Sequence, residues 1–145
     1  MPSVGLQKVC LMRTIVLISC AKNKQSHKAK AKDLYISPLF RKSLAYAQKL
    51  KPDMIYILSA KYGLLDLDTE IEDYNVTLKI MQSDEIKSWA KKVLEQLAAK
   101  TNLKQDHFVF LAPVEYRKYL LPHILSFEIP MEGMTIGKQL QYLSE

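Results

Sequence analysis

Side chains that could do chemistry follow three apolar runs of this chain. Cys20 ends the first run, residues 59–63 (Ser-Ala-Lys-Tyr-Gly) follow the second, and Glu115 and Tyr116 come soon after the third. A thiol can be made nucleophilic by neighbouring lysines, a carboxylate can transfer protons, and a lysine can hold a phosphate. A tyrosine ring can stack on a base. This mixture predicts a ligand site with catalytic potential.

We divide the candidates into a reacting group and a surrounding group. Lysines would neutralise phosphate, and Gly63 would supply a backbone angle that glycine adopts easily and let a ligand approach the main chain. Asp73 would act as a general base or accept a ribose hydroxyl. The candidate catalytic residues are Cys20, Lys61, Asp73 and Glu115. The candidate substrate-binding residues are Ser19, Lys22, Lys24, Ser59, Tyr62, Gly63, Tyr74, Thr77 and Tyr116.

Each candidate also has a purely structural interpretation. Cys20 can be a small packed hydrophobic residue, and Tyr62 can pack beneath its own loop. Asp73 and the lysines between residues 22 and 32 can be solvated surface charges. We favour a ligand contact for Lys61, because a cation between a buried strand and a Tyr-Gly turn lies where strand-end loops carry function.

Spacing excludes several kinds of site. The glycines match neither a phosphate-binding P-loop nor a dinucleotide fingerprint. His27, His107 and His123 are scattered, and no Cys or His pair has ligand spacing, so no zinc site is expected. The sequence therefore assigns no metal and requires no cofactor.

Length and charge limit the partners. The chain of 145 residues is expected to have a short leader over residues 1–13 and one α/β domain over residues 14–145. A net charge of +6 favours an anionic partner such as a nucleotide, DNA or tRNA. No apolar run approaches the roughly 20 residues of a membrane helix, so no membrane partner is expected. We interpret Cys10 and Cys20 as free thiols of a cytoplasmic protein. The sequence assigns no oligomeric state.

Strands and helices alternate around these residues. Apolar runs predict buried strands at 14–19, 54–58 and 107–112, and a short fourth strand at 127–130. Apolar stripes predict helices over about 38–50, 83–100 and 135–143, with Ser37 or Asp33 capping the first and Ser83 the second. A further helix is expected to carry Tyr116, Tyr119, Leu120 and Ile124. The lysine-rich segment 21–32 is expected to be a mobile, solvated loop, and an acidic polar stretch follows residue 65.

This order predicts a single three-layer α/β domain, with a mainly parallel central sheet of about four strands and helices on both faces. In a parallel sheet all carboxyl ends lie at one edge. Cys20, Ser59 and Ala112 should therefore open onto a shared crevice.

The sequence also resembles a small, poorly characterised family of bacterial and phage domains. The resemblance rests on residues 18–24, 33–35 with Phe40, 58–65, 71–74 with Thr77, and 137–143, and it covers the chain from Thr14 to its end. More distantly, the order of elements is similar to the DNA-binding YaaA peroxide-stress family and to the core domain of archaeosine synthase, which modifies deazaguanine in tRNA. Cys20 and Lys24 match the Cys-x-x-x-Lys part of the synthase signature, and Gln25-Ser26 replaces its Pro-Tyr part. The resemblance implies a uracil-DNA-glycosylase-like fold and a nucleobase or nucleic-acid pocket.

Three classes of function fit these observations, and the third of them is a stress-associated scaffold without a small ligand. The leading hypothesis is an enzyme acting on a nucleobase or N-glycosidic bond in a nucleotide, DNA or RNA. The alternative is a non-catalytic nucleic-acid-binding module related to oxidative-stress or nucleic-acid-modification systems. That module would spread its binding energy over the lysine run, with affinity falling steeply with salt.

Overall fold

The computed structural model describes residues 12–21, 24 and 26–144, and these build one five-stranded sheet and one two-stranded sheet. The order in the larger sheet is β4-β3-β1-β6-β7, and every neighbouring pair is parallel except β3 with β4. Its strands are β1 (Thr14–Ser19), β3 (Met54–Ser59), β4 (Gly63–Asp66), β6 (His107–Leu111) and β7 (Ser126–Glu128). The predicted α/β domain with a mainly parallel sheet is confirmed, with five strands in place of about four.

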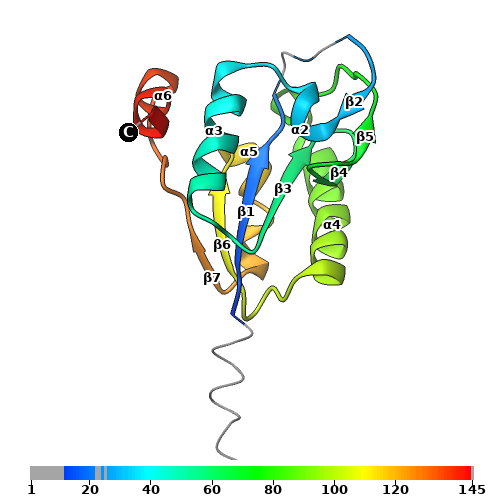
Figure 1. Ribbon diagram of the computed structural model, residues 1–145. Helices are drawn as coiled ribbons and strands as arrows, with labels where there is room; N and C mark the ends of the chain where they lie inside the picture. Colours follow the sequence, from blue (N-terminus) through cyan, green and yellow to red (C-terminus); the bar gives the residue numbers. More distant parts are fainter. Residues whose placement is uncertain (1–11, 22–23, 25, 145) are drawn as a thin grey trace, which may run out of the picture.

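Helices cover both faces of this sheet (Figure 1). On one face lie α2 (Ala31–Leu34), α3 (Pro38–Lys49) and α6 (Ile136–Ser144); on the other lie α4 (Ser83–Lys100) and α5 (Val114–Arg117). The central strand β1 explains this arrangement, because Ile15 and Leu17 pack under α4 while Val16 and Ile18 pack under α3. A strand buried on both faces has no polar side to alternate, which is why its sequence is continuously apolar.

The two long helices form where their apolar stripes predict them. The Ser37 hydroxyl caps α3 by accepting a hydrogen bond from the Phe40 N–H at 3.1 Å. The predicted cap of α4 is wrong by one residue, since Gln82 is the N-cap and its N–H donates to Glu85 at 3.2 Å. Ser83 is then the first helical residue, and the reciprocal bond with Glu85 replaces the hydroxyl cap.

The helix expected after the third strand is interrupted. Only α5 and a short 3₁₀ turn, η2 (Leu121–His123), are helical between residues 114 and 123. Pro122 accounts for the break, because proline has no N–H and its ring collides with the carbonyl one helical turn earlier.

The end of the segment expected to be a mobile loop is structured, over residues 29–32. β2 (Ala29–Lys30) pairs antiparallel with β5 (Glu70–Ile71), and α2 buries Ala31 and Leu34. Here the positive charges of the lysine run are paired with carboxylates of the acidic stretch. The ion pairs are Lys28–Glu70 at 4.0 Å, Lys30–Asp68 at 3.9 Å and Lys32–Asp68 at 3.4 Å.

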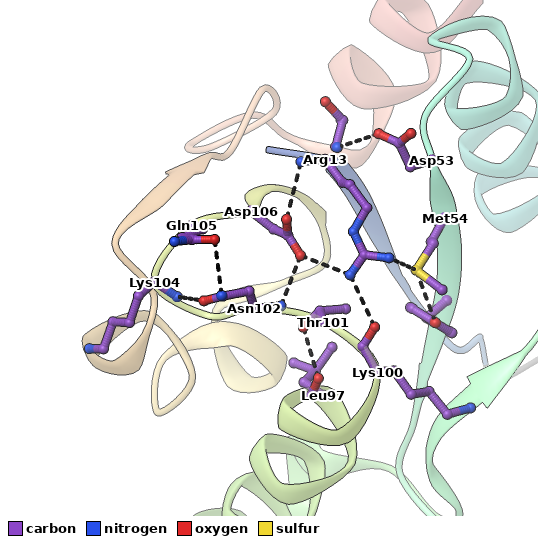
Figure 2. Close-up of polar contacts among 12 residues, drawn as sticks. Arg13, Asp53, Met54, Leu97, Lys100, Thr101, Asn102, Lys104, Gln105 and Asp106 are labelled. Carbon is purple, nitrogen blue, oxygen red and sulfur yellow. Dashed lines mark hydrogen bonds and ion pairs between the residues drawn. The ribbon is translucent and has the colours of Figure 1, made fainter. Parts of the chain in front are cut away.

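A polar network ties the elements together at the amino ends of the strands (Figure 2). The buried Asp106 carboxylate accepts hydrogen bonds from the Arg13 backbone and guanidinium, both at 3.1 Å, and from the Asn102 N–H at 2.8 Å. Arg13 also donates to the Lys100 carbonyl at the end of α4. This network holds β1, α4 and β6 together at the edge opposite the candidate site.

In the described part of the chain, no helix is both long and apolar enough to cross a membrane.

Candidate functional site

The carboxyl ends of β1, β3 and β6 lie side by side. Ser19 pairs with Leu58, Ile18 pairs with Leu111, and the Cys20 N–H donates to the Leu58 carbonyl at 2.9 Å. Cys20, Ser59 and Ala112 therefore lie at one edge of the sheet, as parallel pairing predicts. The shared crevice expected between them stays a prediction.

The strand-end loop expected after β3 is the turn of a hairpin. Residues 60–62 form a tight turn, and Gly63 starts β4 as the partner of Ser59 in an antiparallel hairpin. Gly63 has φ +78°, in the left-handed region that favours glycine. Leu64 and Leu65 are buried, which is why the chain turns back onto the sheet. Lys61 and Tyr62 consequently lie at the tip of a hairpin.

Ser59 organises the base of this hairpin. Its side chain has no exposed surface, and its hydroxyl accepts hydrogen bonds from the N–H groups of Lys61 at 3.2 Å and Tyr62 at 3.0 Å. The same hydroxyl donates to the Tyr74 hydroxyl at 2.9 Å. Its backbone carbonyl accepts the Trp89 indole N–H at 2.8 Å, so α4 also holds the strand end. Ser59 is thus a buried structural hub, which does not leave its hydroxyl open to a ligand.

Two buried tyrosines continue the network. The hydroxyls of Tyr74 and Tyr35 lie 2.6 Å apart, and Tyr62 packs edge-on against the Tyr74 ring with centroids 5.6 Å apart. Tyr35 follows α2, and Tyr74 follows β5. The small β2–β5 sheet therefore brings both phenols over the edge of the main sheet.

Cys20 and Tyr116 form the other half of the cluster. The Cys20 sulfur lies 3.5 Å from the Tyr116 hydroxyl, which also accepts the Leu78 N–H at 3.4 Å. Cys20 is a half-buried free thiol, whereas Tyr116 is buried with its ring edge-on to Trp89. We call Cys20, Tyr35, Ser59, Tyr74 and Tyr116 the site cluster.

The tyrosines of the site cluster are held in their neutral form. Burial raises the pKa of Tyr35, Tyr74 and Tyr116, and the adjacent Cys20 side chain raises each of these pKa values further. At neutral pH these phenols keep their protons, so they can donate hydrogen bonds and do not serve as bases.

Two lysines lie over aromatic rings next to the site cluster. The Lys24 ammonium lies 4.6 Å from the Tyr74 ring centroid, and the exposed Lys61 ammonium lies 5.2 Å from the Tyr62 centroid. Cations in this position over aromatic rings are attracted by the ring quadrupole. Lys22 lies outside the described residues, so its predicted phosphate contact stays a prediction.

Of the other predicted residues, Ser19 directly precedes Cys20, and the Thr77 side chain is a hydrogen-bond partner of Tyr116. Asp73 is exposed beside Tyr74, and Ser19 is half-buried in β1. Thr77 caps the 3₁₀ turn η1 (Leu78–Ile80) by accepting the Lys79 N–H at 3.3 Å. Glu115 lines a separate hollow with Ser83 and Tyr119. Within the described ranges, no group of three or more His, Cys, Asp or Glu side chains is arranged to hold a metal ion.

Sequence reasoning missed Tyr35 and Trp89 as members of the site surroundings. Trp89 lies among the buried residues of α4, and its indole N–H reaches the Ser59 carbonyl. Tyr35 gave one usable signal. It is an aromatic residue two positions before the Ser37 cap, a position from which its ring packs against Phe40 in the first turn of α3.

One protein family matches nearly the whole chain. A family of unknown function, DUF6884, matches residues 15–145. The chain belongs to this family. No curated protein and no solved structure matches it. The DUF6884 match includes every residue of the site cluster, so the site lies within the family's domain.

Proposed function

We propose that this DUF6884 protein binds a nucleotide or nucleic acid at the site cluster and acts on the nucleobase or its N-glycosidic bond. One observation carries the proposal: a half-buried thiol at the end of the central strand lies 3.5 Å from the hydroxyl of a buried, neutral tyrosine. The resemblance to the YaaA and archaeosine synthase families, and to a uracil-DNA-glycosylase-like fold, supports the same substrate class. The free thiol favours a cytoplasmic setting.

The proposal gives each group a role. Cys20 attacks the sugar carbon of the N-glycosidic bond: a C–S bond forms as the C–N bond to the base breaks, and the thiol proton passes through the Tyr116 hydroxyl to the leaving base. Water then hydrolyses the C–S bond, which restores the thiol and releases the sugar. Lys61 and Lys24 hold a phosphate at the rim, and the half-buried Tyr62 ring offers a stacking face.

Local charge pairing favours this localised site over a binding module spread along the lysine run. Lys28, Lys30 and Lys32 each lie within 4.0 Å of an exposed carboxylate, which offsets their charge before any phosphate arrives. Lys61 projects from the hairpin tip at the strand edge. A bound phosphate should therefore depend on Lys61 more than on the run.

The test is binding to a panel of nucleosides, nucleotides, single-stranded DNA and tRNA, measured by isothermal titration calorimetry. We expect Lys61→Ala to weaken the best ligand by about tenfold, as expected for a lost charged hydrogen bond. Lys104→Ala is the matched control, because it removes the same charge from an exposed residue at the opposite edge. Binding that is unchanged in Lys61→Ala would refute the proposed phosphate contact and with it the proposal. Equal losses at Lys24, Lys28 and Lys30, with Lys61→Ala matching the control, would favour the binding module.

The thiol has its own test. In a Cys10→Ala background, Cys20 is the remaining cysteine of the chain, so alkylation by iodoacetamide followed by mass spectrometry reports on it alone. A bound ligand should slow this alkylation. Cys20→Ser and Cys20→Ala should both bind the ligand and lose turnover, whereas turnover by Cys20→Ala would remove the thiol from the mechanism.

A further inference from the structure

A hollow of about 230 Å³ lies on the α4 face of the sheet. Two elements line it: the first turn of α4 contributes Ser83 and Ile86, and the α5 region contributes Val114, Glu115, Lys118 and Tyr119. α5 follows the carboxyl end of β6, and α4 runs from this edge to Lys100 near the amino ends of the strands. The hollow therefore opens at the same sheet edge as Cys20.

The hollow has an aromatic wall with cations around it. The Tyr119 ring is half-buried, with the Lys118 ammonium 5.4 Å and the Lys87 ammonium 5.5 Å from its centroid. Val114 has 48% of its surface exposed and Ile86 is half-buried, so the lining between the polar groups is apolar. An aromatic face, an apolar lining and cations on flexible stems are the features that bind single-stranded nucleic acid.

The segment from Tyr116 to Tyr119 connects the site cluster with the hollow. Tyr116 extends inward to the Cys20 sulfur, and Tyr119, three residues later, lines the hollow. A ligand with two bases could place one base at the Cys20 edge and stack the other on Tyr119, whereas a mononucleotide has only one base to place. Glu115 also lines the hollow, and its carboxylate disfavours phosphate there but can accept a hydrogen bond from a base amino group. The phosphate contacts then belong to Lys87 and Lys118 at the rim.

We infer that the hollow at Tyr119 is a second base subsite, and that the substrate of the site cluster is a single-stranded polynucleotide. This inference rests on the proposed function and narrows its substrate class. A base stacked on Tyr119 takes the place of the lysine stems at the ring, and the ammonium groups move to the adjoining phosphate.

The experiment compares thymidine monophosphate with thymidylate and uridylate octamers, measured by calorimetry on the full chain. Tyr119→Leu should weaken both octamers by about tenfold, the usual loss for one stacked base. It should leave the monophosphate affinity unchanged, because that ligand uses Lys61 and Tyr62. Tyr119→Phe should keep octamer affinity, because the ring and not the hydroxyl does the stacking. Equal losses with DNA and RNA octamers would assign the subsite to both, and a loss with one would assign it to that nucleic acid.

A second variant keeps the inference testable if Tyr119→Leu does not fold. Lys118→Ala should weaken octamer binding and flatten its salt dependence by about one phosphate contact, relative to Lys104→Ala. Octamer affinity that is unchanged in Lys118→Ala, and in Tyr119→Leu where that variant folds, would overturn the second subsite. Monophosphate binding that depends on Lys61 would still leave the proposed function standing. Binding of neither ligand would overturn both.

Discussion

Ser59 shows how one buried hydroxyl can fix the geometry around a reactive group. It accepts two N–H groups of the hairpin turn and donates to Tyr74, while its carbonyl binds Trp89. Mutations of Ser59 and of Tyr74 remove different numbers of these hydrogen bonds. Removing the Ser59 hydroxyl breaks the hydrogen bonds from two backbone N–H groups and the one to the Tyr74 hydroxyl. Removing the Tyr74 hydroxyl breaks only its hydrogen bonds with Ser59 and Tyr35.

We therefore expect Ser59→Ala to cost about 2 to 3 kcal/mol in the free energy of unfolding and Tyr74→Phe about 1 kcal/mol. Urea denaturation of both single variants and of the double variant measures the costs. Because the two hydroxyls bond directly, the double variant should lose less than the sum of the singles, by at least about 0.5 kcal/mol. Strict additivity would mean that the 2.9 Å contact contributes nothing.

Asp106 makes a second residue-scale prediction, about pH. Burial alone would raise the pKa of this carboxyl, but hydrogen bonds from Asn102 and Arg13 together with the Arg13 charge outweigh it and lower the pKa below its ordinary value. The carboxylate thus contributes stability that is fully present above the unfolded pKa of about 4 and is lost as pH falls through the lower folded value.

Asp106→Asn should accordingly cost about 2 kcal/mol near pH 7, since it removes the ion pair with Arg13. The difference between the wild type and this variant should shrink as pH is lowered from about 5 toward about 2. Thermal unfolding across this range measures it. A difference that stays constant with pH would show that the contacts are purely steric. Asp68→Asn serves as the control, because Asp68 is exposed and its two ion pairs, with Lys30 and Lys32, lie on the surface.

At the scale of elements, the β3–β4 hairpin depends on Gly63. A Cβ there would lie 2.4 Å from the Gln96 side-chain oxygen, which accepts the Leu64 N–H at 2.9 Å, and φ is +78°. Gly63→Ala should cost about 2 kcal/mol or more, combining backbone strain with the displaced Gln96. Gly133→Ala is matched in strain, with φ +79° and nothing within 4 Å of the added Cβ. Denaturation midpoints of the two variants separate these effects, and equal costs would remove Gln96 from the explanation.

The sequence predicted the elements whose burial is set locally and missed those set by distant partners. β1, α3 and α4 were predicted close to their observed bounds, because a continuous apolar run or a helical stripe records burial directly. β4 and the β2–β5 pair were missed, because short strands flanked by charge look like solvated loops until the opposite charges meet. At the site, parallel pairing predicted the convergence of Cys20 and Ser59. The contribution of Tyr35 depends on that unpredicted β2–β5 pair.

At the scale of the whole molecule, the formal charge of +6 overstates the positive surface available to a ligand. Part of the lysine run is paired with Asp68 and Glu70 on the same surface. The slope of log affinity against log salt should therefore correspond to few phosphates, about −1 to −2 for a single-stranded ligand. Titrations at several salt concentrations measure it. A much steeper slope would mean that the lysine run takes part in binding.

Trp89 has a practical consequence. It is the single tryptophan of the chain, its indole N–H is bound to the Ser59 carbonyl, and its ring meets Tyr116 edge-on. The protein thus has an intrinsic fluorophore in direct contact with two residues of the site cluster, Ser59 and Tyr116. Emission from unlabelled protein can report both ligand occupancy and opening of the hairpin base, so screening for the missing substrate needs no tag.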